Sequence, residues 1–167
     1  MRGFTLLETI IAITIIAVTS IALVGLGAST SKQGSYLINK TIATHLAQEG
    51  LELVRNIRDT DTITSSTPWD KGINSITSGT INYNSSPTLN NIPSNPSNVK
   101  VCGNTCRLYF DANGFYTHTI TGNPTNFYRM INVVSGATVD TITSEVKWID
   151  HGKSYTIKVT TKLYDWQ

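Results

Sequence analysis

Residues 3–29 read GFTLLETIIAITIIAVTSIALVGLGAS and carry one charged side chain, that of Glu8. Residues 10–28 contain no charge, and as a helix rising about 1.5 Å per residue they would be roughly 28 Å long. That length is close to the ~30 Å hydrocarbon thickness of a bilayer, so the stretch predicts a single membrane span. Arg2 precedes the span, and positive charge tends to stay in the cytoplasm, which predicts that the C-terminal part lies outside.

Two simpler interpretations of this stretch compete with a processed membrane helix. A secretory signal peptide would have a shorter apolar region and a small-residue cleavage site, for which residues 27–30, GAST, are the nearest match. A plain signal anchor accounts for the span but gives Glu8 no role.

Glu8 is costly in a membrane span. A carboxylate costs about 2.5–3.5 kcal/mol at mid-bilayer and less toward the edge. Such a charge normally has a partner, and cleavage between Gly3 and Phe4 would create one, the new α-amino group of Phe4. A one-turn stagger between adjacent helices would bring Glu8 of one subunit onto Phe4 of the next. Glu8 would then fix the register of an assembly, as buried polar residues do in coiled coils.

The sequence G-F-T-L-L-E at residues 3–8, followed by an apolar helix, resembles the class III signal of type IV pilins and type II secretion pseudopilins. The resemblance implies that a prepilin peptidase cuts after Gly3 and N-methylates Phe4. It also implies that Glu8 pairs with the amine of a neighbouring subunit during filament assembly. Residues 46–59, LAQEGLELVRNIRD, and the closing strands resemble V-type minor pilins and pseudopilin I.

Two features depart from the family pattern. The leader, residues 1–3, is shorter than usual, which leaves an upstream start codon open. Gly25 stands where many pilins have a proline. Gly25 and Gly27 would either loosen the helix there or allow close helix packing, and the residues favour neither.

Residues 31–59 continue the helix with one apolar stripe, since no proline interrupts residues 4–59. The expected stripe is Ile38, Ile42, Leu46, Leu53, Val54 and Ile57, beside Ala43, Ala47 and Gly50. Residues 60–98 are rich in Ser, Thr, Asn and Pro, which predicts a long surface loop with a short strand at 79–84.

Strands are expected over the rest of the chain, because apolar and polar residues alternate between turn signals. The predicted strands are 99–103, 106–111, 114–120, 127–135, 144–150 and 153–166, with hairpin turns at 111–114 (D-A-N-G) and 150–152 (D-H-G). The residues expected to be buried are Val101, Leu108, Phe110, Phe127, Ile131, Val133, Val146, Trp148, Ile157, Val159 and Leu163.

The chain thus predicts an α+β fold in which a long N-terminal helical spine packs against a C-terminal antiparallel β-sheet head. Its expected parts are a leader (1–3), a transmembrane and filament-core helix (4–30), an amphipathic second half of that helix (31–59), a loop (60–98) and the sheet head (99–167).

Candidate chemistry in the head is sparse. Cys102 and Cys106 can form a small disulfide only in an oxidising compartment, and two reduced thiols are the alternative. Their spacing offers too few ligands for a metal. Asp111 to Gly114 resembles the start of a calcium loop, but Gly122 occupies the twelfth position, where a Glu is required, so a hairpin turn is favoured. No cofactor is expected.

Catalytic and nucleic-acid signals are weak. The histidines, at positions 45, 118 and 151, are isolated, and no hydrolase, zinc-protease or phosphate-binding motif is present, so the sequence does not indicate an enzyme. The net charge is +2, too small to argue for a nucleic-acid surface. Lysines 147, 153, 158 and 162 with Trp148, Tyr155 and Tyr164 could contact a DNA strand, but the solvated face of a sheet is the commoner explanation.

The sequence therefore predicts a structural subunit, a minor pilin-like protein that assembles into, or primes, a type IV pilus. A type II secretion or competence pseudopilin is the close alternative, and a signal-anchored extracytoplasmic binding module is the alternative from another class. The implied partners are other pilin or pseudopilin subunits, a prepilin peptidase, an inner-membrane assembly platform and, before assembly, membrane lipid. The expected location is a single-pass inner membrane protein with its head outside the cytoplasm, and then the filament.

Overall fold

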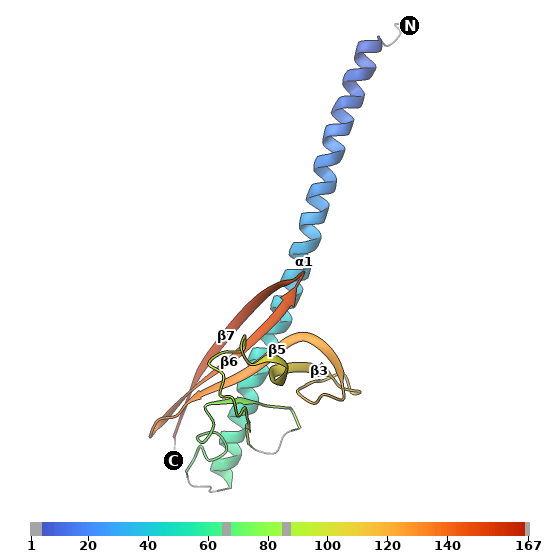
Figure 1. Cartoon of the computed structure of the whole chain (residues 1–167). Coiled ribbons are helices and arrows are strands. Elements are labelled where there is room, and N and C mark those ends of the chain that lie inside the picture. The colour runs from blue at the N-terminus through green and yellow to red at the C-terminus, as the bar shows by residue number, and fades with distance from the viewer. Residues whose placement is uncertain (1–4, 65–67, 85–87, 166–167) are drawn as a thin grey trace. The chain divides into compact units, whose positions relative to one another are not determined.

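The computed structural model of the protein describes residues 5–64, 68–84 and 88–165 (Figure 1). The chain divides into two units, Met1–Ile38 and Asn39–Gln167. Helix α1, Leu6–Ile63, contributes to both and has 58 residues. It begins after Thr5, whose hydroxyl accepts a bond from the Glu8 N–H at 3.4 Å, and it ends four residues later than the sequence pattern predicts.

The second unit holds an antiparallel sheet that follows the helix in the chain. Its strands are β1 (Ser78–Thr80), β2 (Asn90–Asn91), β3 (Arg107–Phe110), β4 (Tyr116–Thr117), β5 (Asn123–Val134), β6 (Val139–Asp150) and β7 (Lys153–Tyr164). Strands β5, β6 and β7 form a meander of three 12-residue strands. The other edge of β5 pairs with β3 near its start and with β1 near its end, and β2 and β4 extend these pairs. The expected α+β fold with a helix packed against an antiparallel sheet is confirmed.

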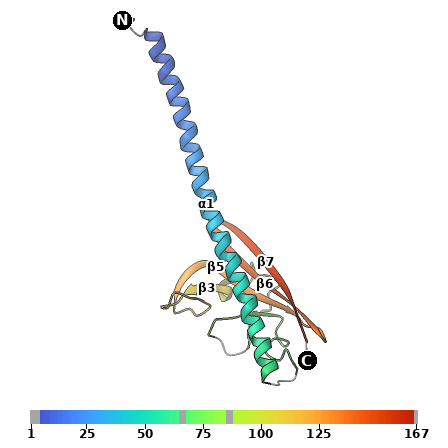
Figure 2. The same ribbon diagram turned by 180° about the vertical axis from the view of Figure 1, so that it is seen from behind.

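One face of the sheet packs against the part of α1 that follows Asn39 (Figures 1 and 2). The helix buries a stripe of mostly small and aliphatic residues, namely Ala43, Leu46, Ala47, Gly50, Leu51, Val54 and Ile57. The stripe agrees with the sequence pattern except that Leu51 joins it, while Ile42 and Leu53 are only half-buried. Ile38 is exposed. Alternate residues of the strands, among them Ile131, Val133 and Ile142, pack against this stripe.

The opposite face of β5 is covered as well, by the chain between β2 and β3. Ile92, Val99, Cys102 and Cys106 pack there against Met130 and form a second, smaller cluster. Strand β5 is therefore buried on both faces, and the successive residues 129–131 are all inaccessible to solvent.

Three expectations about the middle of the chain were wrong. Residues 99–103 form turns that lead into a short 3₁₀-helix, Gly103–Cys106, because Val99 and Cys102 pack onto β5 instead of pairing as a strand. Val101 and Phe110, expected in the core, are 66% and 37% exposed. The segment 60–98 is more than a surface loop, because it supplies β1, β2 and part of the core through Trp69, Ile73, Ile81, Leu89 and Ile92.

Gly50 lets α1 approach the sheet closely. A Cβ atom at this position would lie 2.8 Å from Ser144 Oγ, 3.0 Å from Ile131 Cδ1 and 3.2 Å from Arg129 Cδ. Any larger side chain would push the helix off β5 and β6, since these groups are themselves buried. The need for a glycine at position 50 therefore comes from the packing of the helix on the sheet.

Arg129 fixes the same contact by hydrogen bonds. Its side chain is 1% exposed and donates to the carbonyl oxygens of Leu46 at 3.1 Å and Ile81 at 2.8 Å. Glu49 Oε1 lies 3.3 Å from the guanidinium and is the partner of its charge. Burial lowers the pKa of Arg129, and the Glu49 carboxylate opposes that shift. One guanidinium thus joins α1, β5 and the chain after β1.

Gly50→Ala is expected to lower the free energy of unfolding by about 1–3 kcal/mol, because overpacking outweighs the ~1 kcal/mol gain in helix propensity. Gly34→Ala is the matched control in the same helix, since a Cβ there meets nothing within 4 Å. Urea unfolding of both variants, followed by near-UV circular dichroism, measures the difference. Equal stability of the two variants would contradict the close contact.

Candidate functional sites

The N-terminal part of α1 is an apolar rod without a core of its own. Its large aliphatic side chains are 49% to 79% exposed from Leu6 to Leu26. Residues 5–31 contain one charged side chain, that of Glu8, which lies in the first turn of the helix. Of the residues predicted to be processed, Gly3 and Phe4 lie outside the described residues.

This rod is long and apolar enough to cross a membrane. Within the described residues one helix, α1, meets that condition, and the apolar window in it is 0% buried. A water-soluble helix with such a surface would need a protein partner on every side, so a membrane or a helical assembly is the environment that suits it.

The hydroxyl groups on the rod bond back to its own backbone. Thr14 and Thr19 each donate to carbonyl oxygens three and four residues earlier, at 2.8 to 3.1 Å. Ser20 and Thr30 donate to the carbonyls four residues before them, at 2.7 and 3.0 Å. These polar groups are therefore satisfied within the helix and need no water.

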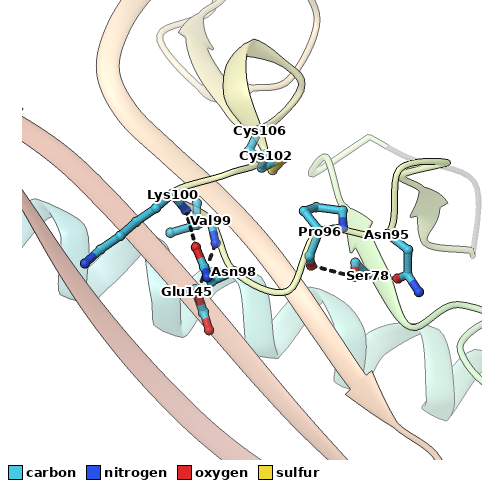
Figure 3. Close-up of a disulfide and its surroundings, with 9 residues drawn as sticks. All are labelled: Ser78, Asn95, Pro96, Asn98, Val99, Lys100, Cys102, Cys106 and Glu145. Atoms are coloured by element: carbon cyan, nitrogen blue, oxygen red, sulfur yellow. Dashed lines mark hydrogen bonds between the residues drawn. A yellow bond between two sulfur atoms is a disulfide. The ribbon is translucent and has the colours of Figure 1, made fainter.

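The disulfide in the head lies on the outer face of the sheet (Figure 3). Cys102 and Cys106 are joined, with their Cα atoms 5.8 Å apart, and Cys106 is fully buried against β5. The bond closes a ring around the 3₁₀-helix. It therefore holds in a compact turn the end of the segment that covers β5, residues 92–106, called the covering segment below. Metal binding by this pair is excluded in this state, because both sulfurs are used in the bond.

Glu145 holds a second point of the covering segment, at Val99 (Figure 3). Its side chain, 3% exposed, accepts a hydrogen bond from the Val99 N–H at 3.1 Å and one from Asn132 Nδ2 at 3.4 Å. Lys158 on β7 forms an ion pair with it. The Glu145 carboxylate thus links β5, β6 and β7 to the covering segment. The ammonium group of Lys158 neutralises its charge.

Asp111 organises a turn between β3 and β4. Its Oδ1 accepts the N–H groups of Asn113 and Phe115, both at 2.9 Å, and its Oδ2 accepts the Tyr83 hydroxyl at 2.6 Å. Hydrogen bonding to Tyr83 is the main reason that the pKa of Asp111 is lowered. One carboxylate oxygen serves the turn and the other binds Tyr83, which supports the hairpin interpretation over a calcium loop. No group of three metal-ligating side chains occurs among the residues the structure describes.

The basic and aromatic residues of the last hairpin do not form one surface. From the pairing of β6 with β7, three lysines and one aromatic residue project to the outer face, namely Lys147, Lys158, Lys162 and Tyr164. Trp148, Tyr155 and Lys153 project to the other face. Trp148 and Tyr155 stack on each other with ring centroids 5.4 Å apart. The nitrogen of Lys147 lies 4.0 Å from the centroid of the Tyr128 ring instead. This separation argues against a stacking platform for single-stranded DNA built from Trp148 and Tyr155.

The sequence pattern did not predict the buried roles of Arg129 and Glu145. Arg129 lies where the strand pattern requires an apolar residue, and Glu145 lies on the face that alternation assigns to solvent. The position of Arg129 among inward-facing apolar residues was the signal that could have indicated its burial. The alternation pattern contained no such signal for Glu145.

No protein-family model matches the chain, and neither the curated proteins nor the solved structures include a significant match to it.

Replacing both cysteines, Cys102→Ser with Cys106→Ser, is expected to cost about 2 kcal/mol, because the ring of the disulfide no longer restricts the unfolded chain. The Val99 amide should exchange its hydrogen faster, while the amides of β6 and β7 keep their protection. Hydrogen exchange followed by mass spectrometry measures both.

Thr105→Ser is the control, since it changes an exposed side chain within the same ring and leaves the bond. Unchanged exchange at Val99 in the double variant would show that the disulfide does not hold the covering segment.

Proposed function

We propose that this protein is a membrane-inserted, prepilin-like structural subunit that assembles into, or primes, a helical filament of the type IV pilus class, most like a minor pilin. One observation carries the proposal: the N-terminal helix exposes an apolar surface of membrane length that bears a single carboxylate, Glu8, in its first turn. A plain membrane anchor needs the apolar surface but not the charge.

The physical basis is an exchange of environments. In the membrane, lipid covers the aliphatic side chains of the helix, and in a filament the same helices of neighbouring subunits cover them. Glu8 is neutralised in the filament by the α-amino group that cleavage after Gly3 creates on Phe4 of the next subunit. The pair then sets the stagger between subunits.

The local cap gives Glu8 a competing structural role. Thr5-Leu6-Leu7-Glu8 has the spacing of a capping box, and the Glu8 N–H reaches the Thr5 hydroxyl. An uncharged Gln at position 8 keeps the ability to cap but cannot neutralise an amine. The two roles are therefore separable by experiment.

The head would face the oxidising side of the membrane, which suits the Cys102–Cys106 disulfide. A prepilin peptidase, an assembly platform and other pilin-like subunits are the proposed partners. Type II secretion and competence pseudopilins would use the same helix in the same way, and the genes that surround this one distinguish these systems. No observation on the described residues favours an enzyme.

The mature N-terminus tests the class of function. Mass spectrometry of the protein from its native membrane is expected to find a chain that begins at an N-methylated Phe4. A chain that retains Met1, or one cleaved near Ser29, would support a signal-anchored or a secreted binding module and would exclude a processed filament subunit.

Glu8→Val and Glu8→Gln are both expected to insert into the membrane normally and to be lost from sheared filaments by about tenfold or more, equivalent to ~1.4 kcal/mol. Glu52→Gln is the matched control, because Glu52 is an exposed carboxylate of the same helix that pairs locally with Arg55. Quantitative immunoblots of filament and membrane fractions measure incorporation. Normal incorporation of Glu8→Gln would show that Glu8 acts only as a helix cap, and it would contradict pairing with the Phe4 amine.

A further inference from the structure

A hollow of about 420 Å³ opens on the head between β1, β2 and the β3–β4 hairpin. Its walls include three asparagines, Asn82, Asn90 and Asn104, and the ring of Tyr109. Thr105 extends the rim on the 3₁₀-helix, and His118 lies in the wall. The volume falls in the range of small-molecule sites, roughly 300–1,000 Å³.

His118 is the unusual member of this wall. Both of its ring nitrogens are buried and lack a well-formed hydrogen bond within the described residues, although the Arg107 backbone offers the ring a weak one. Its backbone N–H donates to Asn82 Oδ1 at 2.7 Å, which fixes the two residues relative to each other. Burial, followed by the nearby positive charge of Arg129, lowers the pKa of His118 to about 3. The ring is therefore neutral at physiological pH, with one donor and one acceptor nitrogen.

A buried ring nitrogen without a well-formed hydrogen bond is destabilising, so His118 gains from a partner that reaches it. Because His118 lines the hollow, a ligand bound there lies beside the ring and is a source of such a partner. A partner can donate to one ring nitrogen or accept from the other, because a neutral imidazole offers one acceptor and one donor.

The charge of the hollow restricts the ligand further. None of the described residues that line it carries a charged side chain. Arg129, whose charge acts on His118, already donates to Leu46 and Ile81 and pairs with Glu49. Arg107, next to the lining residues in the chain, donates to the Thr125 carbonyl. An anionic ligand would therefore have no counter-charge, and neither would a cationic one.

We propose that this hollow is a binding site for a neutral saccharide. Side-chain amides and hydroxyls both donate and accept hydrogen bonds, as the hydroxyl groups of a sugar do. Tyr109 and the 79% exposed Ile120 supply apolar surface for the C–H face of a sugar ring. A neutral peptide is the alternative occupant, and the probes below distinguish it from a sugar.

The test is nitrogen-15 NMR of the full-length protein, observed at the His118 ring. The protein is held in a zwitterionic detergent, since a sugar-based detergent would itself compete. The neutral probes are methyl glucoside, N-acetylglucosamine and lactose. Glucuronate serves as the anionic probe, and N-acetylglycine amide as the neutral peptide-like probe.

At least one neutral sugar is expected to shift the His118 ring nitrogens in a saturable way, and Asn104→Ala should weaken that binding by about tenfold, or ~1.4 kcal/mol. Asn126→Ala is the matched control, since Asn126 is an exposed asparagine outside the hollow. Asn104 is itself exposed, so its loss should not unfold the head.

Three results would overturn the proposal: no saturable shift with any neutral sugar, an equal loss of binding in the two asparagine variants, or tighter binding of glucuronate or the peptide-like probe. The measurement needs no assembly machinery. Its failure therefore leaves the proposed filament function untouched, and failure of filament assembly leaves this site untouched.

Discussion

The head depends on how closely its helix approaches its sheet. Gly50 is a point of close approach, where even one added carbon would meet Ser144 and Ile131. Arg129 sits in the same place and ties the backbone of α1 to the chain after β1 through two carbonyl oxygens. A bulky residue at 50 would separate the surfaces, and loss of the guanidinium would remove both hydrogen bonds that tie β5 to α1 and to the chain after β1. Packing and hydrogen bonding therefore act on one contact, and the register of helix against strands follows from it.

The outer face of the sheet is organised by a different chemistry. The covering segment has few large apolar residues, and it is held by a disulfide at one end and by the Glu145 carboxylate at Val99. Ser78 adds a third tie, since its hydroxyl bonds to Asn95 at 2.8 Å and to the Pro96 carbonyl at 3.1 Å (Figure 3). A segment that could not bury enough apolar surface by itself is in this way fixed by polar and covalent links.

The sequence predicted the elements that rest on local patterns. The long helix follows from helical periodicity without proline, and β5, β6 and β7 follow from alternation and from the turn at Asp150–Gly152, where His151 and Gly152 both adopt positive φ. Residues 60–98 were misjudged because a few scattered aliphatic and aromatic residues, such as Trp69 and Ile81, gain their burial from long-range contacts. Arg129 and Glu145 were not predictable, since the partners that make their burial tolerable come from distant parts of the chain. The hollow beside His118 likewise exists only once four separate segments meet.

The hydroxyls of the N-terminal helix have a thermodynamic consequence. Because Thr14, Thr19, Ser20 and Thr30 close their hydrogen bonds inside the helix, those bonds are the same whether fatty acyl chains or other proteins surround it. Moving the helix from one surrounding to the other leaves its internal polar enthalpy constant. The work of extracting it then depends on how its aliphatic surface is solvated and on the fate of a single acidic group.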